Sequence, residues 1–260
     1  MATLKGPLDF TGTLGNLSAY ERKDLDKVII RKKSSHTKEQ IYTDPRFKRI
    51  RQNSAEFAAC TKLTASIRDA TAPVRHLGDT QFTGALNALA KKIQAQDMKG
   101  KRGERSLYLS RCHGMITGFN FNANCFFDSV LRFPVTYTLN RETASVTLNI
   151  PELTPGVQLH LPWQKPYYRL VASLGAVGDV LFQKGAYTDP GTSFFEYANT
   201  DWNVADAVAP ATSIHLQITE GISPTATLLL SIGIEAGSPD RFAGIRTVAN
   251  TGTAKILWAF

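Results

Sequence analysis

Hydrophobic residues recur at helical spacing in one long stretch near the front of the chain. Between Asp44 and Ala70 they stand three, four or seven positions apart, which places them on one face of a helix. These residues are Phe47, Ile50, Phe57, Cys60, Leu63 and Ile67. Asp44 can cap the helix, and Pro45 suits its first position because the missing N–H would have no helical partner there. The pattern predicts one helix over residues 44–70.

A second helix is predicted over residues 79–98, with Asp79 as a possible cap. Its apolar stripe has spacings of four, three and four, at Phe82, Leu86, Leu89 and Ile93. The segment from Thr71 to Pro73 is expected to separate the two helices. Two amphipathic helices joined by a short connection can pack as a pair, so residues 44–113 are predicted to form a two-helix module.

The first 43 residues are glycine-punctuated and strand-like. Leu17–Tyr20 and Val28–Arg31 flank a polar turn, which predicts a β-hairpin. An isolated hairpin is marginally stable in water, so this one needs a covering surface. Two interpretations stay open: the segment packs on its own chain, or it is an arm that adds a strand to a neighbouring subunit.

From residue 114 onward the pattern changes to short runs of β-branched and aromatic residues separated by turn residues. Val146–Ile150 and Ile214–Ile218 alternate strictly between apolar and polar positions. This pattern predicts an antiparallel β-sandwich over residues 114–260. The apolar run Ile256–Phe260 is expected to be its last strand, with a plug in a neighbour's groove as the alternative. The predicted fold class is α+β: a hairpin arm, a two-helix module and a β-sandwich.

The charge of the chain is unevenly distributed. Of a net charge of +8, residues 1–118 carry 22 Lys and Arg against 11 Asp and Glu, or +11, and residues 119–260 carry 8 against 11, or −3. A basic front and a mildly acidic back suit a nucleic-acid partner. They equally suit a subunit whose front docks on the back of its neighbour, because opposite fields select partner and register.

Two groups of cations are therefore the candidate binding residues. The expected interface residues lie in the hairpin and at the start of the first helix: Lys27, Arg31, Lys32, Lys33, Arg46, Lys48, Arg49 and Arg51. A basic loop offers a candidate phosphate or anion contact through Lys99, Lys101, Arg102 and Arg105. This loop lacks the P-loop pattern, and a flexible solvated loop is the favoured interpretation.

No catalytic or metal-binding motif stands out. The three cysteines and five histidines show no metal-ligand spacing, and no nucleophile elbow occurs. The sequence therefore predicts no enzyme activity, no metal, no cofactor and no small-molecule ligand. Two aromatic-rich patches, Tyr167–Tyr168 and Phe194–Phe195 with Tyr197, could stack on sugars or bases, or fill the sandwich or a subunit interface.

Part of the front half resembles a family of uncharacterised proteins from bacteroidete genomes and their phages. The resemblance covers roughly the first 70 residues and rests on Gly12–Asn16, Arg31–Lys33, Thr37, Arg49–Asn53 and Phe57. It implies a component of phage-derived or phage-like particles, without an attached enzymatic activity. The back half resembles a fibronectin-III or jelly-roll type of sandwich in its pattern alone.

The leading hypothesis is a non-enzymatic subunit that assembles with itself into a filament, tube or particle. A nucleic-acid-binding protein is the alternative, and a carbohydrate-binding sandwich module ranks third. The N-terminal residues lack the apolar stretch of a secretory signal, and no run approaches the ~20 apolar residues of a transmembrane helix. We therefore expect synthesis in the cytoplasm without membrane insertion, with release in a particle as an open alternative.

Overall fold

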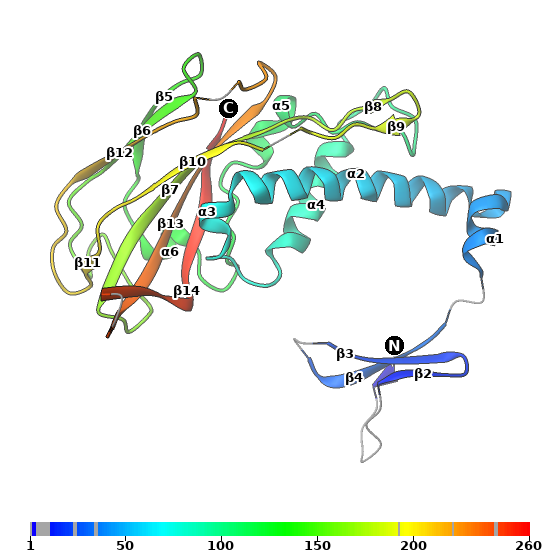
Figure 1. Cartoon of the computed structure of the whole chain (residues 1–260), viewed down its shortest axis with the longest axis horizontal. Coiled ribbons are helices and arrows are strands. Elements are labelled where there is room, and N and C mark those ends of the chain that lie inside the picture. The colour runs from blue at the N-terminus through cyan, green and yellow to red at the C-terminus, as the bar shows by residue number, and fades with distance from the viewer. Residues whose placement is uncertain are drawn as a thin grey trace. The chain divides into compact units, whose positions relative to one another are not determined.

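The computed structural model describes residues 2–3, 11–22, 25–33, 36–191, 193–219, 221–241 and 244–260. The chain divides into two compact units, Met1–Gln52 and Asn53–Phe260, here called unit 1 and unit 2. The fold is mixed helix and strand with antiparallel sheets, as the sequence predicts. Figure 1 shows the elements of both units, and each unit is described by itself.

Unit 1 contains a four-stranded antiparallel sheet in the order β1-β4-β3-β2. Its strands are β1 (Ala2–Thr3), β2 (Gly12–Leu14), β3 (Leu17–Arg22) and β4 (Leu25–Lys32). The predicted hairpin is confirmed, because β3 pairs with β4 from Leu17 opposite Lys32 to Arg22 opposite Leu25. Among the described residues of this unit, the buried apolar side chains are those of Ala19, Val28 and Ile29.

Short helical segments follow the sheet. In α1 (Lys38–Thr43), Thr37 and Gln40 exchange side-chain and backbone hydrogen bonds in a capping box. Asp44 then caps the 3-10 helix η1 (Pro45–Phe47), and α2 (Lys48–Ala70) continues from it. The helix predicted over residues 44–70 is therefore present, with its first turn tightened.

The expected apolar face of this long helix is only partly correct. Seven residues between Ala59 and Ala70 are buried, whereas Glu56 is the only buried residue between Lys48 and Ala58. Ile50 and Phe57, which were expected on the apolar face, are 47% and 54% exposed. The reason is that the apolar contacts of α2 begin at Ala59, whereas Glu56 before it makes polar contacts with unit 2.

The other helices are short: α3 (Ala72–Arg75), α4 (Phe82–Gln94), α5 (Leu109–Cys112), η2 (His113–Met115) and α6 (Phe127–Val130). The helix predicted over residues 79–98 is α4, which begins later because Asp79 accepts a hydrogen bond from the N–H of Gln81 in the preceding turn. The first helix ends at Ala70, as the segment from Thr71 to Pro73 predicts. Pro73 then lies in the first turn of a new short helix, α3.

Unit 2 is built on a five-stranded antiparallel sheet in the order β10-β7-β13-β14, with β11 also paired to β7. Its strands are β7 (Tyr167–Val177), β10 (Phe195–Asn199), β11 (Asn203–Val204), β13 (Thr227–Asp240) and β14 (Gly244–Ala259). A second sheet, β12-β6-β5, contains β5 (Thr136–Asn140), β6 (Ser145–Ile150) and β12 (Thr212–Gln217). A small hairpin joins β8 (Phe182–Gln183) to β9 (Ala186–Tyr187). Because β14 pairs with β13, the chain's last apolar run forms a strand within its own chain.

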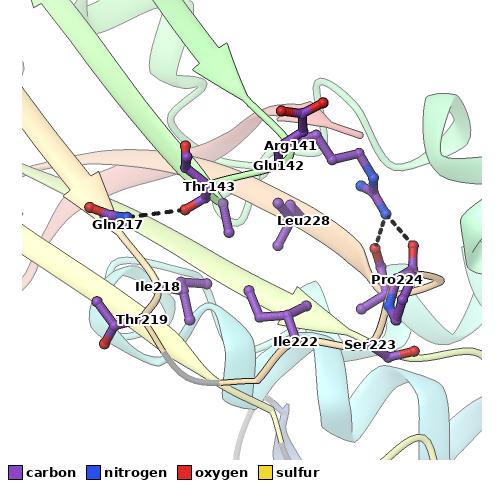
Figure 2. A pocket seen from close by; sticks show the side chains of 12 residues that line it. Arg141, Glu142, Thr143, Gln217, Ile218, Thr219, Ile222, Ser223, Pro224 and Leu228 are labelled. Carbon is purple, nitrogen blue, oxygen red and sulfur yellow. Dashed lines mark hydrogen bonds between the residues drawn. The ribbon is translucent and has the colours of Figure 1, made fainter.

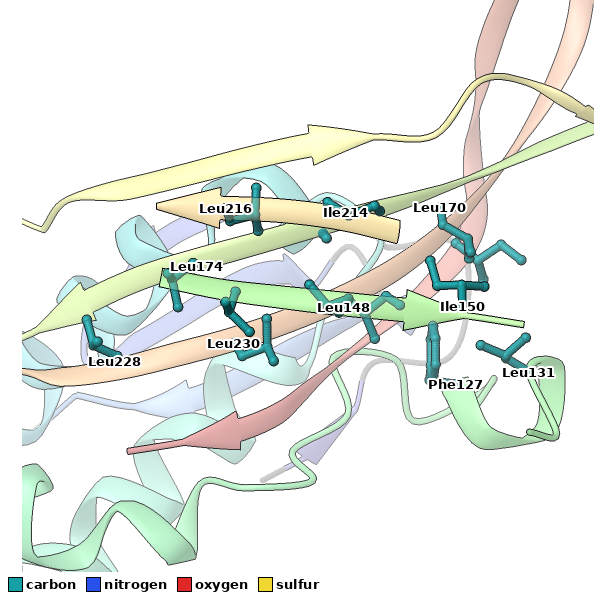
Figure 3. Close-up of a cluster of buried hydrophobic side chains, with 14 of the residues drawn as sticks. Phe127, Leu131, Leu148, Ile150, Leu170, Leu174, Ile214, Leu216, Leu228 and Leu230 are labelled. Carbon is teal, nitrogen blue, oxygen red and sulfur yellow. The ribbon is translucent and has the colours of Figure 1, made fainter. Parts of the chain in front are cut away.

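Alternation along the strands gives the five-stranded sheet two apolar faces. Leu228 and Leu230 of β13 join Leu148 of β6 and Ile214 of β12 in a buried cluster that both sheets share (Figure 3). On the other face, Leu229 of β13 packs in a second cluster with residues of α2 and α4. Helices thus cover one face of this sheet, and the three-stranded sheet covers part of the other (Figure 1).

Candidate functional site

The cations predicted for an interface lie in unit 1, and most of them are exposed. Arg31, Lys32 and Lys33 are exposed at the end of β4, and Lys48 and Arg49 are exposed at the start of α2. The guanidinium of Arg31 lies 5.6 Å from the ring centroid of Tyr20. The side chain of Lys27 lies outside the described part of the structure.

Two of the predicted interface residues already have partners in unit 1. Arg46 forms an ion pair with Asp44 at 2.6 Å, and its hydrogen bonds hold the pKa of Asp44 below the usual value. Arg51 is half-buried, and its Nη1 donates to the carbonyls of Ile41 and Asp44 at 2.7 and 2.9 Å. These two residues therefore stabilise the turn between α1 and α2, and the exposed cations named above are the ones left for a partner.

Hydrogen bonds to the half-buried Asp97 hold the backbone of the basic loop of unit 2. Asp97 accepts hydrogen bonds from the backbone N–H groups of Lys99, Gly100 and Ser106. Arg102 donates to Asn53 of α2. Lys99, Lys101 and Arg102 are exposed, so three of the four predicted anion contacts face solvent.

The fourth predicted contact, Arg105, is committed to Glu56 of α2. Their side chains approach to 3.4 Å, and Glu56 also accepts from Lys91 at 2.5 Å and from the N–H of Gly103 at 2.9 Å. Burial raises the pKa of Glu56, but these hydrogen bonds and charges outweigh it and the pKa lies below its usual value. Arg105 therefore anchors the loop and is a poor candidate for binding an external anion.

A site that the sequence interpretation missed lies on the helix-covered face of the five-stranded sheet, where the helices end. It is a concave pocket of about 500 Å³. The strands contribute Arg169, Val171, Phe195, Tyr197, Asn199, Glu235 and Thr247, and α3 and its flank contribute Ala72, Pro73 and His76. We call this the Glu235 pocket. The aromatic-rich run at Phe194, Phe195 and Tyr197 gave a signal for two of its residues, but no spacing in the sequence links His76 to Glu235.

Glu235 is the buried centre of this pocket. Its side chain is 2% exposed, and it is the direct cross-strand partner of Arg169, whose Nε donates to it. The Nε2 atom of His76 lies 2.9 Å from its other oxygen, and the Arg169 guanidinium stacks 4.5 Å from the ring centroid of Trp202. Burial raises the pKa of Glu235, but the hydrogen bonds from His76 and Arg169 outweigh it and the pKa lies below its usual value.

The backbone around Glu235 is irregular on the neighbouring strand. Glu235 pairs with Gly252 of β14 and Gly237 pairs with Thr247, so the residues from 248 to 251 bulge out opposite a single residue. Asn250 in this bulge has φ +59°, which asparagine tolerates better than most residues. Bulges bend a strand and are frequent beside functional sites. Gly237 allows Trp202 to approach, because a Cβ there would lie 2.6 Å from the indole ring.

A second cavity, of about 690 Å³, lies where the β5–β6 turn meets the connection between β12 and β13 (Figure 2). Arg141 donates from Nη2 to the carbonyls of Pro224 and Ala226, and Gln217 donates to the carbonyl of Thr143. These side chains tie loop to loop, while Ile218, Ile222 and Leu228 line the opening. Arg141 and Gln217 are thus used in holding the chain together.

Other candidate chemistry is sparse in the described ranges. No group of three or more His, Cys, Asp or Glu side chains there is placed to hold a metal ion. Burial raises the pKa of the Cys60 thiol to about 11, which makes it a poor nucleophile. None of the described helices combines the length and the apolar character needed to cross a membrane.

Comparison with known proteins adds no relative. No protein family, no curated protein and no solved structure matches this chain.

Proposed function

We propose that this protein is a non-enzymatic structural subunit that assembles with itself into a filament, tube or phage-like particle. Unit 1 is the contact module, and its cations dock on the less basic surface of another copy. The two sheets of unit 2 form a β-sandwich that supplies the wall of the assembly. A head-to-tail contact between different surfaces repeats from copy to copy, so it generates rings or helical arrays.

The concentration of charge in unit 1 carries this proposal. Residues 1–52 contain 12 Lys and Arg against 6 Asp and Glu, a net +6 of the total +8, and residues 53–260 contribute 18 against 16. Lys32, Lys33, Lys48 and Arg49 are exposed and have no acidic partner among the described residues. Like charges gathered without partners repel one another, and contact with an acidic surface relieves that repulsion.

The apolar burial in the described part of unit 1 supports the same proposal. The described residues of its four-stranded sheet bury three apolar side chains, and small domains need a substantial buried area to offset chain entropy. Leu14 and Leu17, in adjacent strands, are 66% and 37% exposed. Burial of these side chains against a neighbour would add stability to unit 1.

The test compares assembly of the wild-type chain with two charge-reversed variants. One carries Arg31→Glu, Lys32→Glu and Lys33→Glu, and the control carries Lys92→Glu, Lys99→Glu and Lys101→Glu, the same change in charge on exposed residues of unit 2. We expect negative-stain images and light scattering to show ordered particles for the wild type and the control, and monomers for the first variant. A wild-type chain that stays monomeric at high concentration and low salt would refute the proposal.

Nucleic-acid binding is the alternative that the same exposed cations favour. It predicts that log K falls linearly with log salt concentration, with a slope that scales with the number of phosphates contacted. Titration of a fluorescent single-stranded and a double-stranded oligonucleotide into nuclease-treated protein separates the two proposals. Tight, salt-sensitive binding by a protein that forms no particles would favour this alternative over self-assembly.

A further inference from the structure

We propose that the Glu235 pocket binds a neutral carbohydrate. This site is separate from the cations of unit 1, so the inference goes beyond the proposed assembly and does not depend on it. It rests on three features of the pocket: exposed aromatic rings, a balanced set of hydrogen-bonding groups, and a rigid buried centre.

The aromatic rings belong to Phe195 and Tyr197, two residues apart on β10 and therefore on the same face of the sheet. Their ring centroids are 6.5 Å apart, and the residues are 38% and 55% exposed. Two large exposed rings at the mouth of a pocket are costly to leave in water. The C–H face of a sugar ring is apolar and flat enough to cover such rings, whereas its edge carries hydroxyl groups.

The polar groups in the pocket can form hydrogen bonds with those hydroxyl groups. The two terminal Nη groups of Arg169 form no hydrogen bond within the described residues, since its Nε alone reaches Glu235. The side chains of Tyr197, Asn199 and Thr247 also line the pocket and make no hydrogen bond to another described residue. Guanidinium groups only donate, whereas amide and hydroxyl side chains both donate and accept. A ligand that does both at many positions, as a saccharide does, matches this set.

The charge of the pocket argues against an anionic ligand such as a nucleotide. Arg169 and Glu235 neutralise each other, and the other titratable residues that line the pocket are His76 and Tyr197. The nearby cations Arg75 of α3 and Arg246 of β14 are paired with Asp69 and Asp240. A phosphate would need free cations, and sites for single-stranded nucleic acid combine aromatic rings with a strongly positive groove. The pocket has the aromatic rings without the positive groove, which favours a neutral ring-bearing ligand.

The buried centre gives the pocket a fixed shape before any ligand arrives. Glu235 holds Arg169 on one side and His76 on the other, and Trp202 stacks on the outer face of the guanidinium. Side chains fixed in this way lose little conformational entropy on binding. The volume of about 500 Å³ falls in the range of small-ligand pockets and fits one or two sugar rings.

The experiment is a glycan array probed with the full-length protein, followed by calorimetric titration of the best neutral oligosaccharide. We expect Phe195→Ala and Tyr197→Ala each to weaken binding at least about tenfold, because each removes a stacking surface. Tyr197→Phe should bind within about threefold of the wild type, since it keeps the ring. Phe126→Ala is the matched control, because Phe126 is 54% exposed and lies outside the pocket.

Three results would overturn the inference. The first is an array on which the wild-type chain binds no glycan above background. The second is binding that Phe195→Ala and Tyr197→Ala leave unchanged. The third is a wild-type chain that binds no sugar and whose monomer fraction, measured by light scattering, rises with Tyr197→Ala. That result would assign the aromatic rings to an interface between copies.

Discussion

Glu56 and Glu235 are both buried, and hydrogen bonds from other elements hold the pKa of each below its usual value. Glu56 of α2 is bound by Lys91 of α4 and by Arg105, and Glu235 of β13 is bound by Arg169 of β7 and by His76. Removing one member of a buried ion pair leaves the other charge without compensation, which costs more than the pair contributes. These residues therefore fix where helices, strands and loop meet.

Glu235→Gln should destabilise unit 2 by about 2–3 kcal/mol at pH 7, because Arg169 loses its counter-ion and keeps only part of its contact with water. The folded-state pKa of Glu235 is lowered, so its stabilisation is complete above the pKa of about 4.3 of an unfolded glutamate and is lost as the pH falls through the folded-state pKa. Urea denaturation of both chains at several pH values measures the difference, which should shrink below about pH 4. Glu196→Gln is the control, since Glu196 is exposed on β10. Equal stability of wild type and Glu235→Gln at pH 7 would contradict the argument.

The sequence predicts which strand residues are buried, but it does not predict contacts between residues far apart in the chain. Alternation in β6 and β12 identifies the buried positions Val146, Leu148, Ile214 and Leu216, because burial follows the two-residue period of a strand. The pairing of His76 with Glu235 joins residues 159 positions apart, and it exists only once α3 packs on the sheet. The Glu235 pocket was missed for this reason.

At the scale of elements, a close approach between α2 and β7 sets the spacing of helix and sheet. A Cβ added at Gly175 would lie 2.2 Å from the carbonyl oxygen of Ala70, and backbone atoms cannot move aside cheaply. Gly175→Ala should therefore destabilise the protein by about 2 kcal/mol or more.

Gly84 in α4 has open space around it, and Gly84→Ala should stabilise the protein by about 0.5 kcal/mol through helix propensity. Thermal and urea unfolding of both variants checks the pair, and the same sign for both changes would contradict it.

The basic loop offers a second prediction at this scale. Glu56 holds the N–H of Gly103 and the side chain of Arg105, so Glu56→Gln should loosen the loop and speed trypsin cleavage after Lys99, Lys101 or Arg102 by several-fold. Limited proteolysis followed by mass spectrometry locates the cuts. Glu104→Gln changes an exposed glutamate of the same loop and should leave the rate unchanged. A cleavage rate that Glu56→Gln does not alter would mean that other contacts hold the loop.

Elements with strong local signals were predictable, and elements defined by contacts were not. The hairpin, the long helix and the alternating strands follow from periodicity and turn residues within short windows. The hydrogen bonds of the basic loop were not predictable. Its charges indicate exposure to solvent, which holds for Lys99, Lys101 and Arg102, but its acceptors, Asp97 and Glu56, are recognisable only in the fold. The same limit explains why Ile50 and Phe57 were assigned to the buried face. Helical spacing predicts which side of a helix is apolar, but it does not predict along how many turns that side is covered by other elements.

For the whole molecule, the contrast between the two units predicts unequal local stability. The described part of unit 1 buries three apolar side chains, whereas unit 2 contains two large apolar clusters on opposite faces of one sheet. Amides in β3 and β4 should therefore exchange with solvent at a lower opening free energy than amides in β7 and β13. Hydrogen exchange read by mass spectrometry, at increasing sub-denaturing urea concentrations, resolves peptides from the two units.

The same measurement links stability to assembly. If unit 1 docks on another copy, its amides should gain protection as the protein concentration rises, while amides in the centre of β13 should not change, since they are already buried. Arg31→Glu, Lys32→Glu and Lys33→Glu together should remove the concentration dependence, because they reverse the charges that attract the neighbour. Equal protection of both units at every concentration would contradict the assignment of unit 1 as a weakly stable contact module.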